Sequence, residues 1–273
     1  VVVGSGDPNP LVSGRGIQIL REHGIEVTEH ILEDECTRLN EVFFHYIQTK
    51  RPFVVMKYAM TLDGKIATYT GASKWVTGEQ ARNHVQEQRH RYTGIMVGVG
   101  TVLADDPLLT CRKAGCKNPI RIICDTDLRT PLTAQVVTTA KQAPTILVTC
   151  CADREKWTGY EEAGCRILPA ERKNGRIDLE RLMERLGQEG LDSILLEGGG
   201  TLNWAALESG IVQKVQAYIA PKLFGGQTAK TPVEGAGVPL PDCAFQLKNM
   251  VITQLGEDIL LESEVASHVH RDC

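Results

Sequence analysis

One stretch of the chain has the residue types of an anion-binding turn. From Leu196 to Ala205 it reads Leu-Glu-Gly-Gly-Gly-Thr-Leu-Asn-Trp-Ala, between a predicted strand at 193–196 and a predicted helix at 201–209. Glycines let backbone N–H groups approach a bulky anion, and a helix start adds partial positive charge, so the turn suits phosphate or pyrophosphate. Asn203 occupies the place of the third glycine of the dinucleotide fingerprint Gly-x-Gly-x-x-Gly, so that motif is absent. A purely structural glycine turn is the alternative.

Further polar clusters follow other predicted strands. They lie at 61–64, at 100–107 and at 125–126, and Glu197 with its glycines forms the fourth. In open α/β sheets the ligand crevice lies outside the carboxyl ends of the strands. We therefore expect the four clusters to build one shared site.

The elements that would position these clusters alternate between strands and helices. Such alternation predicts right-handed crossovers and a mostly parallel sheet. A closing hairpin would add antiparallel strands at one edge. The predicted strands are 53–60, 94–97, 120–124, 145–149, 193–196, 214–219, 250–255 and 258–262, and the predicted helices are 78–91, 154–162, 179–186 and 201–209.

The first fifty residues differ in character. We expect short strands at 1–3 and 25–28, a helix at 16–23 and a longer helix at 33–47. Apolar residues recur at helical spacing in the longer helix, which predicts a packed face. The sequence Lys50-Arg51-Pro52 then breaks the pattern and makes a plausible linker.

Composition argues against several classes of function. The net charge of −4 argues against a broad nucleic-acid footprint. We find no apolar run long enough to cross a bilayer and no signal peptide, so we expect no membrane association and a cytoplasmic location. The nine cysteines form no Cys-x-x-Cys pair, and their odd number predicts reduced thiols. We expect no metal site in this chain.

Several motifs occur in a specific order. They are MKYAMTLDGK at 56–65, SKWVT at 73–77, GTVLADDPLLT at 100–110, PIRII at 119–123, the glycine loop after Glu197 and APKLFGG at 220–226. In this order they resemble the reductase domain of the RibD (RibG) family, bifunctional proteins of riboflavin biosynthesis. The resemblance runs from about Pro52 to the final strands. It implies an α/β fold like that of dihydrofolate reductase, with a central, mostly parallel sheet flanked by helices.

The resemblance also implies a reaction. NADPH would reduce 5-amino-6-(5-phosphoribosylamino)uracil to 5-amino-6-(5-phosphoribitylamino)uracil. The ribosylamine ring opens to an imine or aldehyde-level carbon at C1′, which accepts the hydride while the site supplies a proton. No metal is needed, because the cofactor carries the difficult step.

Site residues carry over with the motifs. Lys57 and Asp105 are the candidates for polarising or protonating groups near C1′. Guanidinium binds phosphate bidentately, so Arg89 and Arg112 suit the ribose 5-phosphate, and Glu197 would accept hydrogen bonds from the uracil or amino groups. The implied substrate contacts are Ser73, Arg89, Leu109, Arg112 and Glu197. The implied cofactor contacts are Met60, Trp75, Thr101, Asp105, Thr126, Gly199, Gly200, Thr201, Leu202, Asn203, Trp204 and Ala205.

Residues 1–50 resemble the end of the same family's cytidine-deaminase-like domain. The resemblance rests on 1–10, 14–17 and 39–46. Zinc deaminases need a His-x-Glu segment and a Pro-Cys…Cys pair, and this chain has neither. We therefore expect no deaminase activity from this chain, although the complete protein would carry it, with zinc only in that portion. The expected division is a remnant at 1–50, the reductase domain at 51–266 and a tail at 267–273.

Two alternatives stay open. One is an NADPH reductase of the same fold that acts on a pterin such as dihydrofolate. The other is a fragment that binds its ligands without turning them over. The family also suggests a homo-oligomer.

Overall fold

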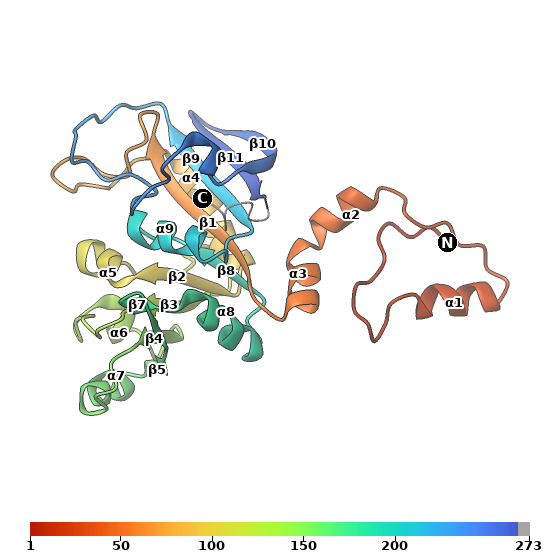
Figure 1. The fold of residues 1–273 in the computed structure, drawn as a ribbon, viewed down its shortest axis with the longest axis horizontal. Helices are drawn as coiled ribbons and strands as arrows, with labels where there is room; N and C mark the ends of the chain where they lie inside the picture. Colours follow the sequence, from red (N-terminus) through yellow and green to blue (C-terminus); the bar gives the residue numbers. More distant parts are fainter. Residues whose placement is uncertain (267–273) are drawn as a thin grey trace. The chain divides into compact units, whose positions relative to one another are not determined.

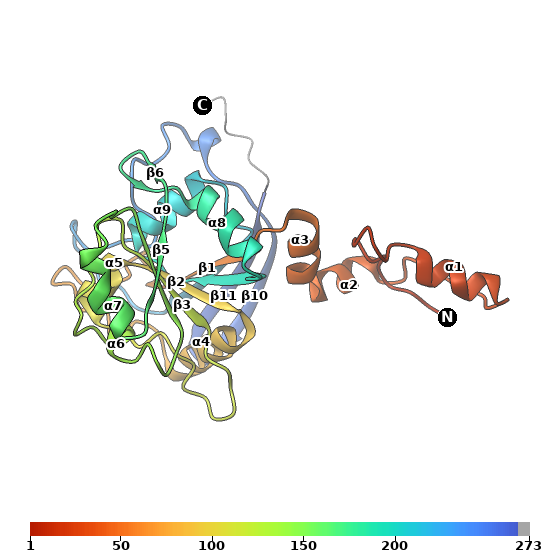
Figure 2. The same cartoon turned by 90° about the horizontal axis from the view of Figure 1, so that it is seen from below.

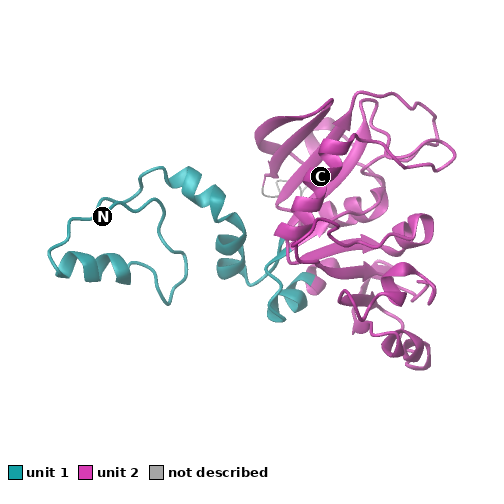
Figure 3. Cartoon of the chain, turned by 180° about the vertical axis from the view of Figure 1, so that it is seen from behind, with its two compact units in different colours: residues 1–53, 183–193 teal, residues 54–182, 194–273 magenta. Residues whose placement is uncertain are grey.

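The computed structural model describes residues 1–266, so the expected tail at 267–273 lies outside the described residues. The chain divides into two compact units (Figure 3). One unit consists of residues 1–53 and 183–193, and the other of residues 54–182 together with the chain from residue 194 onward. The division at residue 53 lies close to the predicted linker, but the sequence did not indicate that 183–193 belongs with the first unit.

The larger unit is built on a nine-stranded sheet (Figure 1). Its strand order is β10-β11-β9-β1-β8-β2-β3-β4-β5. The recorded pairings among β9, β1, β8, β2, β3, β4 and β5 are parallel, whereas β11 pairs antiparallel with both β9 and β10. The predicted mostly parallel sheet with a hairpin at one edge is therefore confirmed. The strands are β1 Phe53–Thr61, β2 Gly94–Gly98, β3 Ile120–Cys124, β4 Thr145–Thr149, β5 Arg166–Pro169, β8 Ser193–Leu196, β9 Lys214–Ala220, β10 Leu247–Leu255 and β11 Asp258–Val265, and β6 Arg172–Lys173 pairs with β7 Arg176–Ile177 in a separate ribbon.

Helices connect the strands, and α4 and α9 lie on opposite faces of the sheet (Figure 2). The segment after β2, expected as a polar loop, forms a helix at Val99–Asp105. This helix is only seven residues long and follows Gly98, so its apolar residues complete no recognisable helical period. The elements are α4 Glu79–Arg91, α5 Val99–Asp105, α6 Gln135–Thr138, η1 Glu155–Trp157, α7 Thr158–Glu162, α8 Leu179–Gln188, α9 Gly200–Glu208 and η2 Pro241–Cys243.

Burial of the central strands in the core explains why their positions could be predicted from the sequence. The side chains of Val54, Ile95, Leu147 and Leu195 have no exposed surface. Strands covered on both faces read as continuous apolar runs, which sets them apart from the polar loops that follow. Because the runs end where the sheet ends, the polar residues after them gather at one edge.

The smaller unit departs from the sequence expectation. The predicted helix at 33–47 is two helices, α2 Glu33–Leu39 and α3 Glu41–Thr49, because the chain leaves helical geometry at Asn40. The predicted packed face is only partly covered: Leu39 is 81% exposed, whereas Val42 and Tyr46 are half-buried. The first helix, α1, spans Arg15–Glu22, and the two short strands reduce to a single bridge between Val2 and Thr28.

Residues 183–193 join this unit through specific contacts. Tyr46 Oη donates a hydrogen bond to the Gly187 carbonyl at 2.9 Å, and the Phe53 N–H donates to the Asp192 carbonyl at 2.8 Å. Such contacts between residues far apart in sequence have no signature in the sequence pattern.

Three further observations concern the described residues only. Within residues 1–266 no helix combines the length and the hydropathy that crossing a membrane requires. The same residues contain no cluster of three or more His, Cys, Asp or Glu side chains placed to hold a metal ion. Seven cysteines among these residues are free.

Candidate active site

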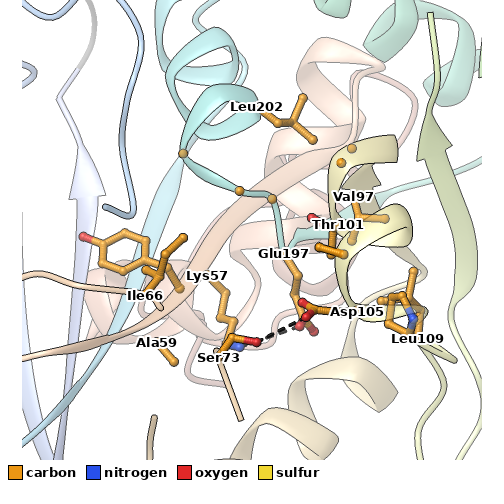
Figure 4. Close-up of a pocket in the computed structure, with 18 of the residues that line it drawn as sticks. Lys57, Ala59, Ile66, Ser73, Val97, Thr101, Asp105, Leu109, Glu197 and Leu202 are labelled. Atoms are coloured by element: carbon orange, nitrogen blue, oxygen red, sulfur yellow. Dashed lines mark hydrogen bonds and ion pairs between the residues drawn. The ribbon is translucent and has the colours of Figure 1, made fainter. Parts of the chain in front are cut away.

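A cavity of about 960 Å³ opens at the carboxyl ends of the central strands of the larger unit (Figure 4). Three of the four predicted polar clusters line it: 100–107, Thr126 and Glu197 with its glycines. The fourth cluster does not. Asp63 instead accepts hydrogen bonds from Thr61 Oγ1 and from the Phe224 and Gly225 N–H groups, which makes 61–64 a structural turn. The expectation of one shared site is thus corrected for 61–64.

Three charged side chains from different elements meet inside the cavity. Arg89 of α4 forms a bidentate pair with Glu197 at the end of β8, with Nε–Oε1 and Nη2–Oε2 distances of 2.7 and 2.9 Å. Lys57 Nζ of β1 lies 3.6 Å from Glu197 Oε2. The exposed fractions of these side chains are only 12–14%. Two cations therefore share one carboxylate in a largely dry environment.

Burial and mutual charge set the protonation of this cluster. Burial by itself would raise the pKa of Glu197, but the charges and hydrogen bonds of Arg89 and Lys57 lower it to about 2. Burial lowers the pKa of Lys57, and the Arg89 charge lowers it further, while Glu197 acts in the opposite direction. Glu197 is therefore ionised at neutral pH, and Lys57 releases a proton more readily than an exposed lysine does.

The pairing with Glu197 changes the expected role of Arg89. The sequence assigned Arg89 to the ribose 5-phosphate, yet its Nε and Nη2 groups contact Glu197 and its Nη1 donates to the Thr110 carbonyl at 3.1 Å. Most of its donors are therefore already engaged within the protein. In this structure Arg89 orients Glu197, and Arg112 is left as the exposed arginine of the predicted pair.

Asp105, the second candidate near C1′, also lines the cavity together with further predicted site residues. Ser73 Oγ donates a hydrogen bond to Asp105 Oδ1 at 3.2 Å, and Thr101 lies on the first turn of α5 (Figure 4). Leu109 is almost fully buried in a left-handed backbone conformation. The buried Arg121 donates to the neighbouring Leu108 carbonyl at 3.1 Å and so fastens this loop to the sheet.

All three glycines of the loop line the cavity, but only Gly199 has open space where a side chain would begin. A Cβ atom added to Gly199 would meet nothing within 4 Å, whereas one added to Gly198 or Gly200 would collide with Asn203 or Glu234. As expected for the start of a helix, no acceptor among the described residues is recorded for the N–H groups of Gly199, Gly200 and Thr201. These donors form a cradle that fits a phosphate or pyrophosphate group.

Most of the predicted cofactor and substrate contacts line the cavity, but three do not. Met60 lies at the end of β1, paired with Ile219. Asn203 is fully buried and donates to the Pro232 carbonyl at 2.8 Å, so it serves the fold of the loop. Trp204 packs edge to face against Phe245. Helical geometry turns these last two residues away from the side on which Thr201, Leu202 and Ala205 meet the cavity.

The structure adds cavity residues that sequence reasoning missed. Arg82 and Gln86 face the cavity from α4, and their spacing with Arg89 (i, i+4, i+7) was the available signal. The Arg82 guanidinium lies 4.9 Å from the Trp75 ring centroid and donates to the Thr77 carbonyl at 2.7 Å. Arg176 was also missed, whereas Arg129, together with Thr126, is a candidate from the sequence for holding a 2′-phosphate. Both arginines line the cavity with Thr126, and neither has an ion pair within residues 1–266.

Fold and site together define a mostly parallel α/β protein with a ligand cavity at its strand ends, built around buried charges and a glycine turn. A sequence profile of the RibD C-terminal domain family matches residues 52–261. The chain belongs to this family, which confirms the resemblance seen in the motifs.

Individual relatives agree with this assignment. The riboflavin biosynthesis protein RibD of Actinobacillus pleuropneumoniae is 54% identical over 98% of this chain and 71% of its own length. The 2,5-diamino-6-ribosylamino-4(3H)-pyrimidinone 5′-phosphate reductase of Methanothermobacter thermautotrophicus is 39% identical over 79% of this chain and 99% of its own length. A solved structure of Acinetobacter baumannii RibD has a TM-score of 0.82 at 33% identity and covers 98% of this chain and 73% of that one. This likeness also confirms the predicted fold class.

Proposed function

We propose that this chain is an NADPH-dependent reductase of riboflavin biosynthesis. Its reaction would convert 5-amino-6-(5-phosphoribosylamino)uracil to 5-amino-6-(5-phosphoribitylamino)uracil. Membership of the RibD C-terminal domain family supports the reductase class. The name of the archaeal relative supports a phosphorylated ribosylaminopyrimidine as the substrate.

The observation that carries the proposal is the buried Lys57–Glu197–Arg89 cluster in one cavity with the glycine cradle. A reductase of this kind has to place a phosphate-bearing cofactor beside a carbon that also needs a proton donor. Open N–H groups serve the first need, and a lysine with a lowered pKa serves the second. Both lie in the same cavity.

The residues at the reacting end have separable roles. Bound NADPH would supply a hydride to C1′ of the ring-opened substrate. Lys57 would hold a proton at Nζ within reach of the group that becomes reduced. Glu197 would accept hydrogen bonds from the pyrimidine while keeping Lys57 in place, and Arg89 would keep Glu197 ionised and oriented. Asp105, which accepts a hydrogen bond from Ser73, offers a second polar contact in the same cavity.

The far end of the cavity fits the phosphates of a dinucleotide. The N–H groups of the glycine loop suit the pyrophosphate, and Arg129 and Arg176 beside Thr126 suit a 2′-phosphate. This division favours NADPH over NADH. Arg112, which lines the same cavity, remains available for the ribose 5-phosphate, since Arg89 is engaged by Glu197.

We also propose that residues 1–50 are the end of a deaminase-like domain, so that the complete protein carries a zinc-dependent deaminase activity that this chain lacks. The corresponding segments of RibD relatives, matched over almost the whole chain, support this assignment. A cytoplasmic location, a homo-oligomer and a small pyrimidine phosphate as the principal partner complete the proposal.

The test is turnover with a defined substrate. Purified chain is mixed with NADPH and the deaminated pyrimidine phosphate, and the loss of reduced nicotinamide absorbance is followed together with the product mass. We expect a product heavier by two hydrogen atoms, and no turnover with dihydrofolate. Turnover with dihydrofolate alone would overturn the proposal, and saturable NADPH binding without turnover of either compound would identify a binding fragment.

A further inference from the structure

Lys57 has a third neighbour besides Glu197 and Arg89. Its Nζ lies 5.7 Å from the ring centroid of Tyr218, a residue of β9 with no exposed surface. The register of the sheet pairs Ala59 with Tyr218 and Lys57 with Gln216, so these side chains share one face of the sheet. An ammonium within about 6 Å of an aromatic face is attracted to it, more strongly where water is excluded.

A chain of partly buried hydrogen bonds begins at the hydroxyl group of Tyr218. Tyr218 Oη lies 2.8 Å from His84 Nδ1, and His84 Nε2 lies 3.2 Å from Gln88 Nε2. Gln216 Nε2 then contacts Gln88 Oε1 at 3.2 Å and Glu262 Oε1 at 2.9 Å. The chain thus links α4, β9 and β11 behind the reacting end of the cavity.

The direction of these bonds follows from the carboxylate at one end. Gln216 donates through its NH₂ group to Glu262 Oε1 and to Gln88 Oε1, so Gln88 presents its oxygen to Gln216. Gln88 consequently turns its NH₂ group to His84. The Nε2 atom of His84 is then the acceptor, and its proton sits on Nδ1, from which it is donated to Tyr218 Oη. One carboxylate on β11 therefore sets the tautomer of a histidine on α4.

We propose that Tyr218 is a positioning residue for Lys57, with its ring held by the directed chain from Glu262 through Gln216 and Gln88 to His84. The inference rests on the proposed function, because it gives Lys57 its task. The charged or titratable groups that face Lys57 are Glu197 from the end of β8, Arg89 from α4 and Tyr218 from β9. Of these, Tyr218 favours the ammonium form without drawing it into an ion pair.

The test compares two substitutions of Tyr218. Tyr218→Leu removes the aromatic face, whereas Tyr218→Phe keeps the face and removes only the bond to His84. The pKa of Lys57 is measured without ligands by NMR on lysine-labelled protein, with the signal assigned by Lys57→Arg. We expect the pKa to fall by about half to one unit in Tyr218→Leu, and to fall by a smaller amount in Tyr218→Phe, because that variant keeps the aromatic face but loses the bond that holds it. The alkaline limb of kcat should move to lower pH by the same amount.

A second measurement does not depend on a stable Tyr218→Leu protein. Nitrogen NMR of histidine-labelled wild-type protein should show the Nδ1–H tautomer at His84, and Glu262→Gln should give a mixture, because an amide can donate or accept. An Nε2–H tautomer in the wild type, or a Lys57 pKa that is the same in Tyr218→Leu as in the wild type, overturns the inference. These readouts need no turnover, so an inactive wild-type chain would overturn the proposed function alone.

Discussion

The charged side chains at the two ends of the cavity differ in burial and in pairing. At one end Lys57, Arg89 and Glu197 are almost enclosed and are bonded to one another. At the other end Arg129 and Arg176 are exposed and have no ion pair recorded among the described residues. At the first end the charged groups are oriented before any ligand binds. At the second end the arginines would gain a partner of opposite charge only when an anionic ligand binds.

This difference indicates that the strength of a charge–charge interaction in this cavity depends on its exposure to water. Charge interactions are strong at the enclosed end because water is excluded and the partners are fixed. At the open end each interaction is screened, so several donors have to act together. Substitutions should therefore affect turnover at the Lys57 end and cofactor affinity at the arginine end.

The largest effect is expected for Lys57→Met. Removing the proposed proton donor should lower kcat by about 10³-fold, within the range for general acid catalysis, and leave the NADPH Kd unchanged. Since the pKa of Lys57 is lowered, the wild-type kcat should decline above a pH below the ordinary lysine value, and this alkaline limb should vanish in the variant. Lys113→Met, at an exposed lysine paired with Glu87, is the control and should change neither quantity.

Glu197→Gln should reduce kcat/KM by about 10²-fold and destabilise the fold by about 3 kcal/mol, because two buried cations lose their carboxylate. Urea unfolding measures the second effect. Glu234→Gln alters a carboxylate of the same cavity whose partner Lys230 is exposed, and it should change stability by less than about 1 kcal/mol. Equal losses in the two variants would contradict the contrast between buried and open charges.

The same carboxylate predicts a pH dependence of stability. The pKa of Glu197 is about 2 in the folded chain against an ordinary value of 4.5. The ionised group therefore stabilises the fold above pH 4.5, and this contribution of about 3 kcal/mol is lost as the pH falls through 2. Unfolding free energies measured from pH 7 down to pH 3 should decline less steeply in Glu197→Gln. Parallel curves would show that Glu197 is not a source of the acid sensitivity.

Gly199→Val should weaken NADPH binding by about 30-fold, which corresponds to about 2 kcal/mol of lost phosphate contacts. The unfolding temperature should hardly change, because the position has extended backbone geometry and open space around it. Gly200→Ala is the matched contrast, since its Cβ would collide with Glu234 and the Thr231 carbonyl. It should lower the unfolding temperature. Unchanged cofactor affinity in Gly199→Val would mean that the loop is only a turn.

The smallest effect is expected at the exposed arginines. Arg176→Ser and Arg129→Ser should each raise the KM for NADPH by about fivefold and leave the KM for NADH unchanged, since a screened phosphate contact is worth about 1 kcal/mol. Arg172→Ser is the control, because Arg172 lies on the same small ribbon, pairs with Asp127 and does not line the cavity. Equal losses for both cofactors would place the 2′-phosphate elsewhere.

The sequence indicated much of the larger unit. The strands at 120–124, 145–149 and 193–196 have their predicted limits, because buried parallel strands read as apolar runs between polar ends. The helix at Val99–Asp105 and the break at Asn40 were missed, since segments of seven residues carry too little periodicity. In the site, strand-end placement predicted Glu197, Thr101 and Thr126 but misjudged 61–64, where Asp63 caps a turn.

By itself the sequence determined the family, the mostly parallel sheet and the residue types available at its carboxyl edge. These depend on local hydrophobic runs and on motifs that a single pass along the chain can read. Only the tertiary structure decided that Arg89 pairs with Glu197, 108 residues away, and that His84 contacts Tyr218 across 134 residues. Charge pairing, pKa shifts and the direction of buried hydrogen bonds depend on distances and on excluded water, and neither quantity exists until the sheet brings its strands together.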